Sequence, residues 1–170
     1  MATKITNTTL ESTPYNNIYD IMDTRSNISD PRDKEDKHTR QFLYSADPFN
    51  TALDFNLLPY IILDLPTREY SKESANGQCK RIAWKHNITV RSARRGSGNS
   101  RSNIGRDDMM DIIDDMEAIF NSASIRNTLS AANMKFIKLT KIDSDSDTIN
   151  DKEVFEALFE LTYTVRMQVY

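Results

Sequence analysis

The sequence predicts an α+β fold, in which a small, mostly antiparallel or mixed sheet carries amphipathic helices on one face. Two stretches, residues 81–91 and 159–170, alternate between apolar and polar side chains. Such alternation is typical of strands with one buried face. Residues 107–120 instead place apolar side chains at helical spacing. Because residues 159–170 end the sequence and read so clearly as a strand, we expect the C-terminus to be tied into the sheet.

Length and composition predict a single domain without a membrane span. The chain has 170 residues, of which 38% are hydrophobic, and a formal net charge of −3. No apolar run approaches the roughly 18 residues of a membrane-spanning helix, and the N-terminal residues lack a signal-peptide core. The single Cys79 excludes an intramolecular disulfide. We expect cytoplasmic synthesis, a flexible N-terminal arm over residues 1–12 and one domain over residues 13–170.

The N-terminal part of that domain predicts a short helix followed by a polar loop. Thr13 and Pro14 suit the N-cap and first position of a helix, and apolar residues at helical spacing continue it to Thr24. Charged residues of both signs fill residues 25–41, so we expect a solvated loop there. Residues 42–55 favour neither a helix nor an extended segment.

Two strands are expected next. The continuous apolar run at residues 60–65 lies between two prolines and predicts a central strand covered on both faces. Residues 67–77 are polar and predict a connection. In the strand at residues 81–91, His86 interrupts the apolar face, and no second histidine has ligand spacing. We therefore interpret His86 as a hydrogen-bonded core or rim residue and not as a metal ligand.

Residues 91–106 predict a mobile polar loop with a concentration of positive charge. The segment contains no acidic residue and three of the four glycines of the chain. Arginines on a flexible backbone suit phosphate or an acidic protein surface. A plain solvated loop, whose charges balance the acidic helix that follows, explains the composition equally well. The candidate partner-binding residues are Arg91, Arg94, Arg95, Arg101 and Arg106.

The C-terminal part predicts a helix, a strand, a polar hairpin tip and the final strand. The helix at residues 107–120 has acidic residues in its first turns, where they complement the helix dipole, and residues 125–132 add a further turn or two. A strand is expected at residues 134–142. Residues 143–152 are expected to form the tip of the hairpin.

No catalytic, cofactor or metal site is predicted. The spacing of Asp143, Asp145 and Asp147 is typical of the start of a calcium loop, but Thr148 and Val154 stand where glycine and glutamate are required. We therefore interpret these aspartates as a solvated turn. The acidic residues of the helix lie on its polar side, and the chain has neither a nucleophile elbow nor a phosphate-binding glycine motif. The sequence predicts a protein that is not an enzyme.

The order of these elements resembles that of the tail terminator (tail completion) proteins of long-tailed viruses of bacteria and archaea. The resemblance covers about residues 13–170 and is carried by residues 59–63, 84–90 and 161–170, together with the helix from Asp107. It implies a small domain with helices packed on a sheet, which assembles as a hexameric ring. The ring caps the tail tube and joins it to the head-side connector, so the protein is a structural component of the virion, in its tail or neck.

The resemblance also implies the partners: further copies of the chain, the tail tube protein and the head-side connector protein, with DNA in the lumen as a further contact. It implies no membrane. Two alternatives stay open. The long charged insertion at residues 25–55 departs from the family and leaves room for another head–tail connector or neck protein. A nucleic-acid-binding module could use the loop at residues 91–106, although the net negative charge and the lack of interleaved aromatic residues oppose it.

Overall fold

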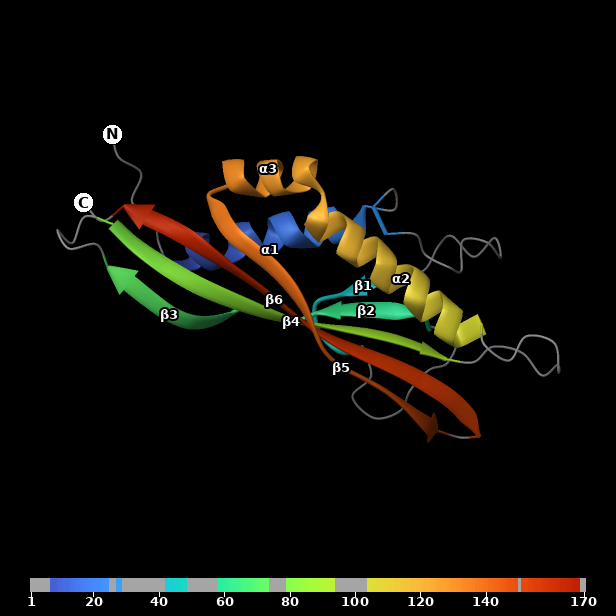
Figure 1. Ribbon diagram of the computed structural model, residues 1–170. Coiled ribbons are helices and arrows are strands. Elements are labelled where there is room, and N and C mark those ends of the chain that lie inside the picture. Colours follow the sequence, from blue (N-terminus) through green and yellow to red (C-terminus); the bar gives the residue numbers. More distant parts are fainter. Residues whose placement is uncertain are drawn as a thin grey trace.

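The chain folds into an open sheet with helices on one face, the α+β class that the sequence predicts (Figure 1). The computed structural model describes residues 7–24, 27–28, 42–48, 58–73, 79–93, 104–149 and 151–168. In chain order the elements are α1 (Asn7–Asp23), β1 (Leu43–Tyr44), β2 (Tyr60–Leu63), β3 (Thr67–Glu73), β4 (Cys79–Ala93), α2 (Ile104–Asn121), α3 (Ala123–Ala131), β5 (Met134–Ile149) and β6 (Lys152–Gln168).

The long antiparallel pair of β4 and β6 forms the centre of the sheet. Their register runs without a break from Cys79 opposite Gln168 to Ala93 opposite Val154. The strand order is β1-β2-β4-β6-β5, with β3 also pairing with β4. All pairs are antiparallel except that of β1 with β2. The last strand of the chain therefore lies inside the sheet, which confirms that the C-terminal segment is tied into it.

The helices cover one face of the sheet, and the main core lies beneath them (Figure 1). Ile82, Trp84, Ile88 and Val90 point from β4 into this core, as their alternation predicts, and the odd-numbered residues of β6 from Phe155 to Val165 join them. The apolar stripe of α2 supplies the other side of the core. Its buried members are Met109, Ile112, Ile113, Met116, Ile119 and Phe120. Hydrophobic burial thus holds α2 against the central strands.

A smaller apolar cluster lies on the opposite face, which we call the helix-free face. It joins Tyr60 and Ile62 of β2 with Leu58, Ala93 and Val154. The neighbouring residues of β2, Ile61 and Leu63, belong to the main core instead. All four residues of β2 are buried, which confirms a strand covered on both faces over residues 60–63. The predicted strand over residues 60–65 is too long, since β2 ends at Leu63 and Leu65 is exposed.

The N-terminal helix is longer than predicted. Because α1 begins at Asn7, Pro14 lies inside the helix and not at its first position. The flexible arm expected over residues 1–12 is therefore wrong for residues 7–12, and residues 1–6 lie outside the described chain. Proline in a helix interior removes one backbone hydrogen bond. Packing opposes that cost, since Ile18 and Met22 of α1 are fully buried in the main core.

Hydrogen bonds also hold α1 on the sheet. The hydroxyl of Tyr15 donates to the backbone carbonyl of Leu63 at 3.4 Å, and the hydroxyl of Tyr19 donates to that of Leu43 at 3.2 Å. In the polar loop expected over residues 25–41, Ile28 is buried in the same core, so that part of the loop is not solvated. Residues 29–41 lie outside the described chain.

Two segments interpreted as polar connections form strands instead. Residues 67–73 form β3 on one edge of β4, while residues 74–77 are not described. Strand β5 continues through Asp143, Asp145 and Asp147 to Ile149, which pairs with Lys152 of β6, so most of the expected hairpin tip is strand. Asp151 has a φ of 59°, a left-handed conformation suited to such a tight turn. These polar strands form because backbone pairing with a neighbour stabilises an edge strand without burying its side chains.

His86 is a core residue, as predicted, and it is fully buried between β2 and β6. Its Nδ1 lies 2.9 Å from the backbone carbonyl oxygen of Asp64, so Nδ1 carries the proton and donates it. Its Nε2 lies 3.0 Å from the hydroxyl oxygen of Tyr163 and accepts from that hydroxyl. Burial lowers the pKa of His86 below 6.5, and the bond to the Asp64 carbonyl opposes this only in part. The neutral ring is thus the form that the core accommodates.

We expect His86 to make the fold acid-sensitive. The folded chain has the lower pKa, so below about pH 6.5 the unfolded chain binds a proton that the folded chain resists. The free energy of unfolding should therefore be largely unaffected by this group above that pH and should fall below it. Urea denaturation at about pH 7.5 and about pH 5.5 measures the difference.

The His86→Gln variant, which lacks a titrating ring, serves as the control. Carboxylates elsewhere titrate in both proteins, so the comparison isolates His86. If the wild type and the variant lost the same amount of stability between the two pH values, the buried neutral histidine would not be the cause.

Candidate partner-binding site

The structure separates the five candidate arginines. Arg91 lies in β4, which continues to Ala93, and Arg106 lies in the first turn of α2, which begins at Ile104. The loop predicted over residues 91–106 is therefore shorter at both ends. Arg94, Arg95 and Arg101 lie outside the described residues.

Arg91 binds acidic residues of its own chain. Its Nη1 donates to Asp47 Oδ2 at 2.6 Å and to the hydroxyl of Tyr60 at 3.2 Å, and its Nε donates to Glu156 Oε2. The register explains the arrangement, because Tyr60 of β2 and Glu156 of β6 lie on either side of Arg91 in the sheet. One guanidinium thus connects β2, β4, β6 and the segment after β1.

The electrostatics agree with a structural role for Arg91. Burial lowers the pKa of Arg91, but the hydrogen bonds that it donates to Tyr60, Glu156 and Asp47 outweigh this effect, so the net shift of the pKa is upward. Burial raises the pKa of the Tyr60 hydroxyl, and the hydrogen bond and positive charge of Arg91 partly oppose this increase. A half-buried cation with these partners stabilises the helix-free face. The expectation that Arg91 lies in a mobile loop is therefore wrong, because its carboxylate partners are distant in sequence and only the sheet brings them to it.

A second ion-pair group crosses the helix-free face nearer the other end of β4. Lys85 Nζ lies 2.9 Å from Glu69 Oε1 on β3 and 3.3 Å from Glu160 Oε2 on β6. These groups are more exposed than Arg91, and solvent-exposed ion pairs contribute little to stability. Outside the small apolar cluster, the helix-free face is thus polar, and ion pairs connect its neighbouring strands.

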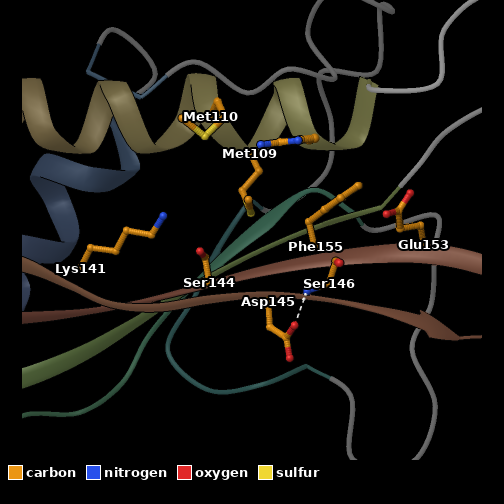
Figure 2. A pocket seen from close by; sticks show the side chains of 9 residues that line it. Met109, Met110, Lys141, Ser144, Asp145, Ser146, Glu153 and Phe155 are labelled. Carbon is orange, nitrogen blue, oxygen red and sulfur yellow. Dashed lines mark hydrogen bonds between the residues drawn. The ribbon is translucent and has the colours of Figure 1, made fainter.

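A cleft of about 370 Å³ lies between the start of α2 and the hairpin of β5 and β6 (Figure 2). Met109 and Phe155 form its apolar part and are buried, whereas Met110 on α2 is 43% exposed. Its charged residues include both signs, with Arg106, Lys141 and Glu153 along it, whereas the side chain of Asp145 points to the other side of β5 (Figure 2). The structure therefore brings one candidate arginine, Arg106, to a hollow surface. The sequence contained one signal for this surface, since Met110 is a large apolar residue outside the buried stripe of α2.

The three aspartates of β5 do not form an ion-binding loop. Each side chain instead accepts a hydrogen bond from the next backbone amide: Ser144 donates to Asp143 at 2.8 Å, Ser146 to Asp145 at 2.7 Å, and Thr148 to Asp147 at 2.7 Å. Across the described part of the chain, no three histidine, cysteine or acidic side chains come close enough to hold a metal ion. Nor does any described helix combine the length and apolar character needed to cross a bilayer.

Comparison with known proteins gives no family for this chain: no model of a protein family matches it, and no curated protein has a significantly similar sequence.

We expect Arg91→Met to lower the free energy of unfolding by about 1–2 kcal/mol, since it leaves Tyr60 and Glu156 without their charged partner. Lys85→Met is the matched control, because it removes a cation of the same face and strand that is more exposed than Arg91 and pairs with two glutamates but with no buried tyrosine. It should cost less. Urea denaturation of both variants measures the difference, and equal losses would contradict the structural role of Arg91.

Proposed function

We propose that this protein is a tail terminator (tail completion) protein. In this role it is a structural component of the virion, without catalytic activity, made in the host cytoplasm. Copies of the chain form a hexameric ring that caps the tail tube and joins it to the head-side connector. The proposal begins from the resemblance in the order of elements, which the described fold retains: a helix, strands, an amphipathic helix and a closing hairpin.

The open sheet is the observation that supports the proposal most directly. At one edge, β5 extends over 16 residues and, among the described residues, pairs only with β6. The other edge is formed by different strands, β1 and β3. A cyclic ring requires two different surfaces on each copy, and unpaired strand edges are ready sites for such contacts.

The arginine-rich segment between β4 and α2 is the second feature that supports the proposal. Arg94, Arg95 and Arg101 lie in it, and Arg106 lies at its end beside the cleft. We assign this segment to the tube or lumen side of the ring, where its charge suits an acidic surface of the tube or connector protein, or DNA. Arg91 has no part in this contact.

We expect the ring to be visible as a particle of about six copies. Light scattering over a concentration series, followed by negative-stain imaging of large species and of isolated tail tubes, measures it. Absence of rings both in solution and at the tube tip would contradict the proposal.

Replacing Arg94, Arg95 and Arg101 together with serine should spare ring formation and impair joining to the tube or the head. The matched control replaces Ser97, Ser100 and Ser102 of the same segment with alanine, which leaves its charge unchanged. Ring particles are counted by imaging, and joining by the yield of complete virions in a complementation assay.

Normal joining by the arginine variant would refute the role given to this segment. Salt-dependent binding of the wild-type protein to arbitrary duplex DNA, lost in the same variant and without any ring, would support a nucleic-acid-binding module instead.

A further inference from the structure

Strand β5 carries its charges in two separate blocks. Lys135, Lys138 and Lys141 lie in its first half, and Asp143, Asp145 and Asp147 lie in its second half. All six residues are exposed. As the last strand in the sheet order, β5 offers its outer edge to another strand.

The register with β6 shows which of these residues share a face. Two shifts interrupt the pairing, one between Lys135 and Lys138 and one between Lys141 and Asp143. The even-numbered residues of β6 from Val154 to Thr164 lie on the helix-free face. One of them is Glu156, which binds Arg91. Their partners on β5 are, in order, Lys135, Lys138, Thr140, Asp143, Asp145 and Asp147, opposite Thr164, Thr162, Glu160, Leu158, Glu156 and Val154. The two shifts thus place the backbone positions of two lysines and all three aspartates in one row. Lys135 Nζ donates to Ser130 Oγ of α3 within its own copy, so its ion pair with a second copy would replace this hydrogen bond.

This row is complementary to itself when read in the opposite direction. We count positions along β6, so that the extra residues at the two shifts are skipped and Lys141, opposite Phe159, is the midpoint of the row. An antiparallel second copy centred at Lys141 then places Lys135 opposite Asp147, Lys138 opposite Asp145 and Thr140 opposite Asp143. Two-fold symmetry repeats each pair, which gives four lysine–aspartate pairs. We propose that β5 is a docking surface for β5 of a second copy, in antiparallel two-fold pairing that joins two sheets edge to edge.

The backbone of β5 supports selective pairing. Alternate amides of a strand point to the same side, and those of Ser144, Ser146 and Thr148 donate to the preceding aspartates. Each carboxylate therefore accepts the hydrogen bond of a backbone amide that an added strand would need as a donor. This arrangement disfavours pairing of the β5 edge with unrelated strands. A second copy presents lysines opposite Asp145 and Asp147, and these ammonium groups draw the two carboxylates into ion pairs and leave their amides available.

Exposed apolar residues lie at both register shifts of β5. Ile142, beside the proposed axis, is 54% exposed, and Phe136, towards the start of the strand, is 70% exposed. On the two-fold axis, Ile142 of each copy comes close to the other, so pairing removes apolar surface from water. The same symmetry sets Lys141 against Lys141, one like-charged pair against four opposite ones. This balance favours a second copy over a partner with a uniformly basic strand, which would meet the lysines of the first half.

Charge reversal in two complementary variants tests the pairing. In the acidic variant, Lys135→Asp and Lys138→Asp make both halves of the row negative. In the basic variant, Asp145→Lys and Asp147→Lys make both halves mostly positive. Each variant alone should self-associate about tenfold or more weakly than the wild type, because each lysine–aspartate pair becomes a like-charged pair. An equimolar mixture should regain pairing, since all four positions are then complementary.

The measurement is molar mass by light scattering over a concentration series at low salt, where charge pairing is least screened. Asp114→Lys with Glu117→Lys on the exposed side of α2 is the control, with the same change in net charge as the basic variant. This control should associate as the wild type does. Recovery in the mixture also shows that both variants are folded.

Three results would overturn the proposal: a wild-type chain that stays monomeric, single variants that associate like the wild type, or a mixture that stays unpaired. The two-fold pair goes beyond the proposed ring and does not depend on it. It uses the same β5 edge as the ring contact, so it is a state of the unassembled protein that ring assembly replaces. Pairing is measured on the unassembled protein and the ring by imaging, so either can fail while the other succeeds.

Discussion

The fold depends on the continuous antiparallel pairing of β4 with β6. The other strands of the sheet build outward from this pair: β2 and β3 pair with β4, β5 pairs with β6, and β1 joins through β2. Side chains of a strand alternate between faces, so a shift of one residue would carry Ile88 and Phe159 out of the core. Burial on one face therefore fixes the register, and His86 and Tyr163 add a hydrogen bond across it.

The same register organises the helix-free face. Once the apolar residues of β4 and β6 point towards the helices, their polar neighbours must share the other face. Arg91 then meets Glu156, and Lys85 meets Glu160. The sequence places Arg91 at the end of a strand and before a basic loop, which suggests a side chain available to a partner. Its position opposite Glu156 in the sheet instead leads to an ion pair within the chain. Surfaces of this kind suit a protein that works through contacts with other chains, as the proposed ring requires.

Strand β5 shows how an edge can be polar and still specific. Its backbone pairs with β6, while most of its side chains stay exposed. The two register shifts divide the strand without ending it, and they align lysines and aspartates on one face. Aspartates that occupy neighbouring amides limit which strands can add to the edge. Charge placement therefore provides selectivity that hydrophobic contact alone would not give to an exposed strand.

The sequence by itself determined the elements with one buried face. Alternation predicted β4 and the end of β6, helical spacing predicted α2, and the isolated His86 on an apolar face predicted a core histidine. Tertiary structure decided the rest. Helix α1 continues past Pro14 because its apolar side chains pack in the main core. Residues 67–73 and 143–149 form strands because their backbones pair with β4 and β6. Asp47 and Glu156 reached Arg91 only across the folded sheet. Periodicity records burial, whereas hydrogen bonds of edge strands and ion pairs between distant residues leave no period in a sequence.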